Sequence, residues 1–144
     1  MKKMKKGVYF IGDPGYVLDE DKFYDITEPP ADNPNDYDFW FSDFSGDGYW
    51  FHKTRYGDGG YNDVKGNTYG VDSGNIGVVY IKDIDIEKLR ELKKLGKFVK
   101  FTKDFYCQYI DGVYFIGQTA KNRVLKNVVE GNEIRSSAPI IIVT

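Results

Sequence analysis

Two aspartates in the middle of the chain are spaced so that they could do chemistry together. Asp58 lies in a Tyr-Gly-Asp-Gly-Gly-Tyr segment, and Asp72 begins the segment Asp-Ser-Gly-Asn. If the intervening chain forms a hairpin that turns at 65–66 or one residue later, residues 59–61 lie opposite Asp72, and the two carboxylates share one end of the hairpin. Such a pair could bind a hard cation or divide into a general acid and a general base. Capping of tight glycine turns by the same carboxylates is the structural alternative.

His52 is the only histidine of the chain, and its side chain is the type that titrates near neutral pH. Together with Ser73 and Asp58 it could complete a Ser-His-Asp triad, although the chain has no Gly-x-Ser-x-Gly segment. In an alternating strand His52 shares a face with Trp50, so a packed structural histidine is the alternative. If the protein is an enzyme, the sequence nominates Asp58, Asp72 and His52 as its catalytic residues.

A larger set of aromatic and acidic residues could bind a ligand or a partner protein. Tyrosine and tryptophan rings stack on bases and sugars, although packing within strands accounts for the same aromatic residues. The acidic members adjoin glycine turns or belong to the Pro- and Asx-rich segment 27–38, which we predict to be a long loop. The predicted ligand- or partner-binding residues are Asp13, Tyr16, Asp36, Asp38, Trp40, Trp50, Tyr56, Asp58, Tyr61, Asp72 and Ser73.

Around these residues the sequence predicts strands joined by tight turns. Aromatic residues make up 17% of the 144 residues, and the 16 glycines lie mostly in turn-like clusters. One helix is predicted at about 85–95, where isoleucine and leucine recur every three residues and Gly96 supplies the stop. The aromatic run 39–41 is predicted to be a core strand, and an exposed aromatic patch beside the acidic loop is the alternative. We therefore expect a single domain, 1–144, of the α+β class and mainly β: an antiparallel sheet or partly open barrel of about eight strands with that one helix.

The hexapeptide Gly-Val-Tyr-Phe-Ile-Gly occurs twice, at 7–12 and at 112–117. The flanking residues do not match, so shared strand chemistry explains the repeat better than a duplication. Two equivalent central strands are the alternative.

Charge is distributed unevenly along the chain, although the formal net charge is only −2. Residues 1–12 carry four lysines and no acid, residues 13–85 carry sixteen acids against five bases, and residues 86–144 carry six acids against eleven bases. The total is too small for a DNA mimic, and the basic half is not dense enough for a dedicated nucleic-acid binder. We therefore expect no nucleic-acid partner.

Composition also bears on cofactors and location. One cysteine, Cys107, allows no internal disulfide, and one cysteine with one histidine cannot build an ordinary Cys/His zinc site. The apolar run after the first lysines is too short for a secretory signal, and no stretch is long enough to span a membrane. We expect no metal, no cofactor, no membrane partner and a cytoplasmic location.

Three short motifs occur in order in the first half of the chain: Gly-Asp-Pro-Gly-Tyr-Val-Leu at 12–18, Tyr-Gly-Asp-Gly-Gly-Tyr at 56–61 and Val-Asp-Ser-Gly-Asn-Ile-Gly-Val-Val at 71–79. In these motifs the chain resembles a loosely defined, uncharacterised family of small phage and bacterial proteins. The resemblance implies a phage or prophage setting and therefore a location in the cytoplasm of a bacterial host cell. It also gives weight to the motif residues Asp13, Asp58, Asp72 and Ser73.

Three hypotheses of function remain open on the sequence. The first is a non-enzymatic, phage-encoded binding protein that inhibits a host defence protein or sequesters a nucleotide-like ligand. The second is a small hydrolase that uses the paired aspartates, with or without a metal ion. The third is a structural or assembly component of a virion, and the sequence leaves the oligomeric state open.

Overall fold

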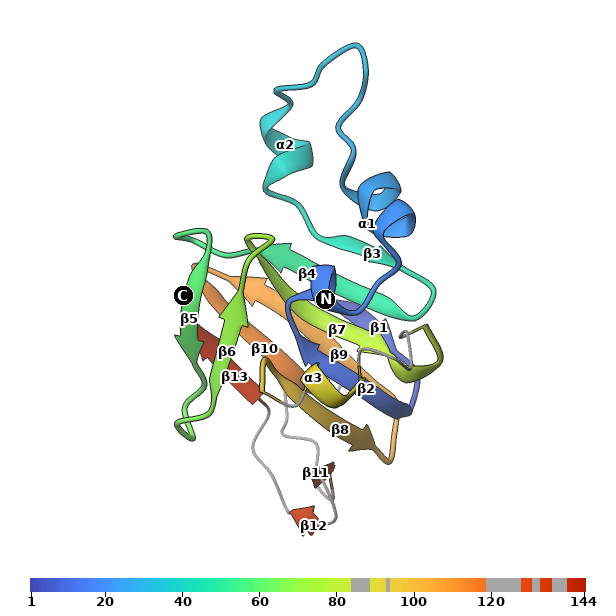
Figure 1. Ribbon diagram of the computed structural model, residues 1–144, viewed down its shortest axis with the longest axis vertical. Coiled ribbons are helices and arrows are strands. Elements are labelled where there is room, and N and C mark those ends of the chain that lie inside the picture. The colour runs from blue at the N-terminus through green and yellow to red at the C-terminus, as the bar shows by residue number, and fades with distance from the viewer. Residues whose placement is uncertain (84–88, 93, 119–127, 131–132, 136–139) are drawn as a thin grey trace.

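The computed structural model describes residues 1–83, 89–92, 94–118, 128–130, 133–135 and 140–144 (Figure 1). Every strand pair in this part of the chain is antiparallel, so the predicted class, α+β and mainly β, is confirmed. The strands are β1 (Lys2–Met4), β2 (Gly7–Gly12), β3 (Phe44–Gly46), β4 (Tyr49–Lys53), β5 (Gly59–Asn62), β6 (Thr68–Val71), β7 (Asn75–Tyr80), β8 (Lys97–Phe101), β9 (Phe105–Ile110), β10 (Val113–Gln118), β11 (Val128–Glu130), β12 (Glu133–Arg135) and β13 (Ile140–Val143). The helices are the 3-10 turns η1 (Pro14–Tyr16) and η2 (Ile81–Asp83), and α1 (Glu20–Thr27), α2 (Tyr37–Trp40) and α3 (Leu89–Leu92).

The strands form two main sheets and one separate hairpin. The larger sheet has the order β12-β11-β8-β2-β7-β4-β3, and the smaller sheet has the order β1-β9-β10-β13. The hairpin β5-β6 is present, but its pairing is centred on Lys65, slightly earlier than predicted, so Gly59 lies opposite Val71 and not opposite Asp72. The carboxylate of Asp63 caps the hairpin loop by accepting hydrogen bonds from the backbone N–H groups of Lys65 (2.9 Å) and Asn67 (3.0 Å). Each sheet is open over the described residues.

A first hydrophobic core unites side chains from both sheets. The two copies of the repeated hexapeptide lie in different sheets, one in β2 and the other at β10. Each copy contributes its tyrosine and its isoleucine to this core, as Tyr9 with Ile11 and Tyr114 with Ile116. The repeated hexapeptide therefore directs the same two side chains into this core from each of the two sheets, because side chains alternate between the two faces of a strand.

A second core lies on the other face of the larger sheet. Phe10, Phe51 and Val79 alternate with the residues of the first core along β2, β4 and β7. Helix α1 adds Phe23, whose ring stacks on Phe51 at 5.9 Å between centroids, and α3 adds Leu92. Asp19 caps the start of α1 by accepting a hydrogen bond from the N–H of Lys22.

The predicted helix at 85–95 is described only in part. The structure describes α3 as Leu89–Leu92, residues 85–88 and 93 of the prediction lie outside the described residues, and residues 94–95 form a turn where the helix was predicted to continue. Gly96 follows the helix at a close approach to β2, where a Cβ atom would lie 2.3 Å from the carbonyl oxygen of Ile11. Glycine is needed there because no side chain fits.

The prediction of a core strand at 39–41 is wrong. Residues Tyr37–Trp40 form the short helix α2, because Asp36 accepts hydrogen bonds from the N–H groups of Asp38 (3.0 Å) and Phe39 (3.4 Å) and so caps a helical turn. Phe39 packs on the second core, whereas Phe41 is 55% exposed. In Figure 1 this helix and the segment before it project away from the sheets beside α1.

Candidate ligand-binding site

Asp13 organises one end of the site from a buried position at the end of β2. Its carboxylate is 1% exposed and accepts four hydrogen bonds: from the N–H groups of Gly15 (2.8 Å), Asp72 (2.8 Å) and Ser73 (2.7 Å), and from the Oγ of Ser73 (2.5 Å). These donors occupy both carboxylate oxygens. Asp13 therefore holds η1 against the 72–74 turn, and Ser73 Oγ is directed toward a carboxylate, with no histidine as its partner.

Tyr16 and Asp72 form the adjoining polar pair. The Tyr16 hydroxyl donates a hydrogen bond to Oδ2 of Asp72. Burial, followed by this hydrogen bond and the negative charge of Asp72, raises the pKa of Tyr16 well above its ordinary value, so the phenol keeps its proton. Asp72 is exposed, and no hydrogen bond engages its second oxygen in the described part of the chain.

Asp58 lies at the same end of the β5-β6 hairpin as Asp72. Gly59 pairs with Val71, so continuation of this register by one residue places Asp58 opposite Asp72. The Oδ1 atom of Asp58 is 3.8 Å from the position that a Cβ on Gly74 would occupy. The structure thus brings together Asp13, Tyr16, Asp72 and Ser73, with Asp58 beside them.

Two adjoining cavities run from this polar end along helix α1. One has a volume of about 480 Å³ and includes Tyr16 and Asp72, and the other has a volume of about 500 Å³ and includes Trp40. Both are lined by Phe23, Tyr24 and Ser73. We call the two cavities together the α1 groove. Each is within the size range of small-molecule pockets.

Lys53 lies in the Trp40 half of the groove. Its ammonium nitrogen is 4.6 Å from the centre of the Trp40 ring, and the ring is held by a hydrogen bond from Nε1 to the carbonyl of Pro34 (2.9 Å). Burial lowers the pKa of Lys53. No acid lies within ion-pair distance of Lys53 among the described residues. This cation is thus partly desolvated and has an aromatic ring as its neighbour, while Glu28, which lines the same cavity, forms no ion pair with it.

Asn75 is the register partner of Lys53 across the β4–β7 pair and lines the same cavity. It is 2% exposed, and its Nδ2 donates to the carbonyl of Ser73 (3.1 Å), whereas Oδ1 has no hydrogen-bond partner. The amide orientation follows from chemistry, because the opposite orientation would set Oδ1 against a carbonyl oxygen. An unpaired buried acceptor costs about 1–3 kcal/mol, which a donor from a ligand would recover.

His52 does not take part in a triad. It is buried, with Nδ1 2.7 Å from the carbonyl oxygen of Lys53 and Nε2 3.1 Å from that of Phe41, and its ring stacks on Tyr109. Backbone carbonyls thus engage both ring nitrogens. The predicted grouping of His52 with Ser73 and Asp58 is not formed, because Ser73 is bonded to Asp13 instead.

Several predicted binding residues lie elsewhere. The prediction of Trp50 as a binding residue is wrong. Its side chain is fully buried in the first core, and no groove residue lies on that face of β4. Tyr61 is half-buried and donates its hydroxyl to the carbonyl of Gly57 (2.7 Å). Asp36 caps α2. The predicted binding residues Asp38 and Tyr56 are exposed and do not line the groove.

Sequence reasoning did not single out most of the residues that line the groove, among them Phe23, Tyr24, Lys53 and Asn75. Phe23 and Tyr24 lie on α1, and their spacing in the sequence carries no signal of a groove. Lys53 and Asn75 lie 22 positions apart and meet only through strand pairing. A register prediction for β4 and β7 is the signal that would have found them.

Comparison with protein-family models, curated protein sequences and solved structures finds no match to this chain. Among the helices described, none has the length and apolar character needed to cross a membrane. In the same part of the chain, no three His, Cys, Asp or Glu side chains are grouped so as to hold a metal ion. The function must therefore be argued from the groove itself.

Proposed function

We propose that the protein is a non-enzymatic binding protein that sequesters a nucleotide-like ligand in the α1 groove. The observation that carries the proposal is the pairing of Lys53 with Asn75 in one cavity. Lys53 supplies a partly desolvated cation without an ion-pair partner, and Asn75 supplies a buried acceptor oxygen without a hydrogen-bond donor. A ligand that carries an anionic group and an N–H or O–H donor satisfies both.

The lining of the groove supports a planar, hydroxylated ligand with one phosphate. Phe23, Tyr24 and Trp40 offer rings on which a base stacks. Lys53 is the single cation of the groove among the described lining residues, which fits one phosphate better than three. The free oxygen of Asp72 accepts from a sugar hydroxyl at the other end. A nucleoside monophosphate or a cyclic nucleotide has all three features.

A thermal-shift screen tests this proposal, because a ligand that binds the native state raises the melting temperature. The panel contains nucleoside mono-, di- and triphosphates, cyclic nucleotides and divalent cations. We expect a rise with a monophosphate or cyclic nucleotide that is lost in Lys53→Gln and kept in Lys65→Gln, whose lysine lies in the hairpin loop. No rise with any nucleotide would overturn the proposal.

The second candidate is the hydrolase, which the closeness of Asp58 to the 72–74 turn favours. In this alternative Asp58 and Asp72 act without His52, whose nitrogens are engaged by carbonyls. Chromatography of each stabilising nucleotide after long incubation separates the two functions. Sequestration predicts unchanged nucleotide, whereas hydrolysis predicts a product whose formation stops in Asp72→Asn.

Inhibition of a host protein is a third candidate, and the outer face of α2 favours it. Tyr37 is 70% exposed and stacks on the exposed ring of Phe41 at 4.5 Å, beside the acidic side chain of Asp38. Capture from a bacterial lysate on immobilised protein tests this role. Loss of a captured protein with Tyr37→Ser but not with Trp40→Leu would assign the interaction to α2 and not to the groove.

A further inference from the structure

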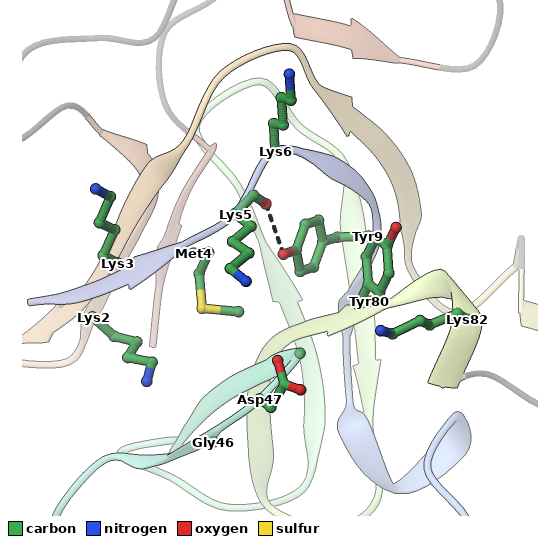
Figure 2. A pocket seen from close by; sticks show the side chains of 11 residues that line it. Lys2, Lys3, Met4, Lys5, Lys6, Tyr9, Gly46, Asp47, Tyr80 and Lys82 are labelled. Carbon is green, nitrogen blue, oxygen red and sulfur yellow. Dashed lines mark hydrogen bonds between the residues drawn. The ribbon is translucent and has the colours of Figure 1, made fainter.

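A third cavity, of about 520 Å³, lies between the N-terminal segment 2–6 and the turn that joins β3 to β4 (Figure 2). Its floor includes buried Met4 and Tyr9, and Tyr80 and Lys82 close one side. We call this cavity the lysine hollow. None of its lining residues belongs to the α1 groove, so it is independent of the proposed function.

Three of the lysines turn toward the hollow and two turn away. In Figure 2 the ammonium groups of Lys2, Lys5 and Lys82 point inward, whereas Lys3 and Lys6 point outward. Lys82 also lies 5.2 Å from the centre of the Tyr80 ring. The inward lysines come from two segments about 80 positions apart. Folding therefore brings their ammonium groups together, and the N-terminal run of lysines alone does not.

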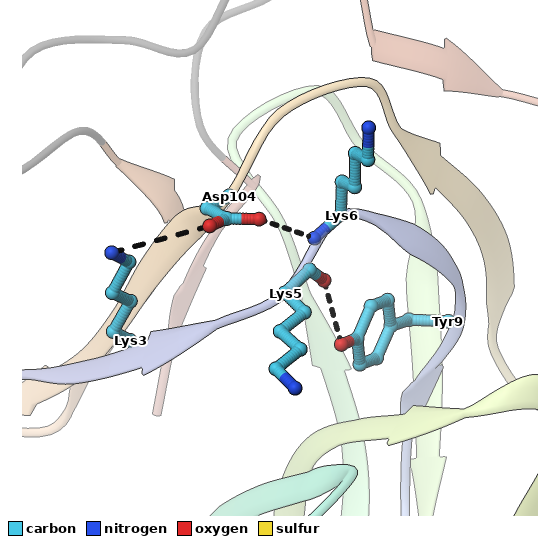
Figure 3. A network of polar contacts seen from close by, with 5 residues as sticks. All are labelled: Lys3, Lys5, Lys6, Tyr9 and Asp104. Carbon is cyan, nitrogen blue, oxygen red and sulfur yellow. Dashed lines mark hydrogen bonds and ion pairs between the residues drawn. The ribbon is translucent and has the colours of Figure 1, made fainter.

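Hydrogen bonds fix the segment that carries Lys5. The buried Tyr9 donates its hydroxyl to the carbonyl of Lys5 (2.7 Å), and the N–H of Lys6 donates to Asp104 (2.9 Å) (Figure 3). Asp104 also lies 4.0 Å from the ammonium of Lys3. These two contacts fix the backbone of residues 5–6, from which the Lys5 side chain extends toward the hollow and the Lys6 side chain extends away from it.

Among the described residues, no acid forms an ion pair with any of the three inward lysines. Asp47 is the one acid in the described lining of the hollow. Positive groups held around one concave surface repel each other and attract an anion of matching charge. Lysine is a common ligand for phosphate because its ammonium is a compact charge with three donors.

We propose that the lysine hollow binds a compact di- or triphosphate group. The three ammonium groups converge on a cavity, which suits a short polyphosphate; an extended polyanion would use lysines in a row along the surface. The group could be free inorganic polyphosphate or the phosphate end of a nucleoside triphosphate. Tyr80 at the rim offers a ring to the base in the second case.

Calorimetric titration of the full chain with inorganic triphosphate tests the proposal. We expect saturable one-to-one binding that the double variant Lys5→Gln/Lys82→Gln weakens about tenfold or more, as the loss of charge-assisted hydrogen bonds requires. Lys6→Gln is the matched control, because it removes the same charge from the same segment on the outer side. It should change the affinity by less than about twofold. Melting temperatures of all variants verify folding.

Two further ligands assign the source of the phosphate. Tighter binding of a nucleoside triphosphate than of triphosphate, lost on Tyr80→Leu, would identify a nucleotide, and equal binding would identify the phosphates alone. Equal losses of affinity with Lys6→Gln and Lys5→Gln would overturn the proposal of a compact site. Binding of single-stranded DNA that is stronger than that of triphosphate and depends on all five lysines would overturn it as well. Absence of binding by triphosphate at low salt would also overturn it.

Discussion

Lys53 and Asn75 face each other across the β4–β7 pair and line one cavity, although their functional atoms lack complementary partners within the described chain. Directly opposed residues on antiparallel strands share a face of the sheet, so the two groups can meet one ligand together. This relationship is the centre of the proposed nucleotide-like site.

The affinity for an anionic ligand should fall as the pH rises. Burial lowers the pKa of Lys53, so the lysine loses its proton at a pH below the ordinary lysine pKa of about 10.4. Binding is therefore strongest below the pKa of Lys53 and weakens as the pH passes through it. Titrations between about pH 7 and 10 should show this loss in the wild type.

Lys53→Arg is the control for that pH dependence. Arginine stays protonated throughout the range, so the variant should bind at high pH as it does at neutral pH. Parallel losses in the wild type and in Lys53→Arg would mean that another group, on the ligand or the protein, causes the effect.

Asp13→Asn should destabilise the fold by about 3 kcal/mol, because a carboxylate that accepts four hydrogen bonds is replaced by an amide that turns a donor toward donors. Urea denaturation measures the change. Asp58→Asn is the control: this residue is exposed, and its substitution should cost less than about 0.5 kcal/mol. Similar values for the two variants would contradict the structural role of Asp13.

Gly77→Ala should lose about 3 kcal/mol of stability or fail to fold. A Cβ at Gly77 would lie 2.0 Å from the carbonyl oxygen of Trp50 in the neighbouring strand, in the middle of the larger sheet. Gly60→Ala makes the same chemical change where the nearest atom would be 3.7 Å away, on Thr68. A soluble, normally stable Gly77→Ala protein would contradict the register of β4 against β7.

Asp63 should make stability depend on acidity. Burial acts to raise the pKa of Asp63, but hydrogen bonds from Asn67, Tyr69 and Lys65 together outweigh it, and the pKa is lowered. The folded pKa then lies below the unfolded value of about 3.9, so this stabilisation is present above about pH 4 and is lost as the pH falls through the folded pKa. Asp63→Asn should cost stability at neutral pH and progressively less in acid, as measured by urea denaturation across pH. A cost that does not change with pH would contradict this assignment.

Local signals in the sequence predicted what local chemistry controls. The hairpin at β5-β6 and the β-rich class follow from neighbouring residues, and the structure confirms them. The run 39–41 was mispredicted as a strand because its apolar composition was given more weight than the helix cap that Asp36 provides. Apolar composition alone does not separate a strand from one helical turn.

The candidate site was predictable in its polar half and, in the other half, at Trp40. Asp13, Asp72 and Ser73 stand in turn motifs, and their types drew attention to them. Lys53 and Asn75 carry no motif, and their meeting depends on the long-range pairing of β4 with β7. Trp50 was wrongly placed in the site because a period of two shows which residues share a face but not which face is buried.

The central claim is most directly tested by the fluorescence of Trp40 during a nucleotide titration. Trp50 lies in the core, so a Trp50→Phe protein reports Trp40 alone, and its Nε1 had no hydrogen bond to lose. We predict saturable quenching by a nucleoside monophosphate or cyclic nucleotide, abolished when Lys53→Gln is added and kept when Lys65→Gln is added. Fluorescence that no nucleotide changes, or quenching that is equal in both double variants, would contradict a ligand site in the α1 groove.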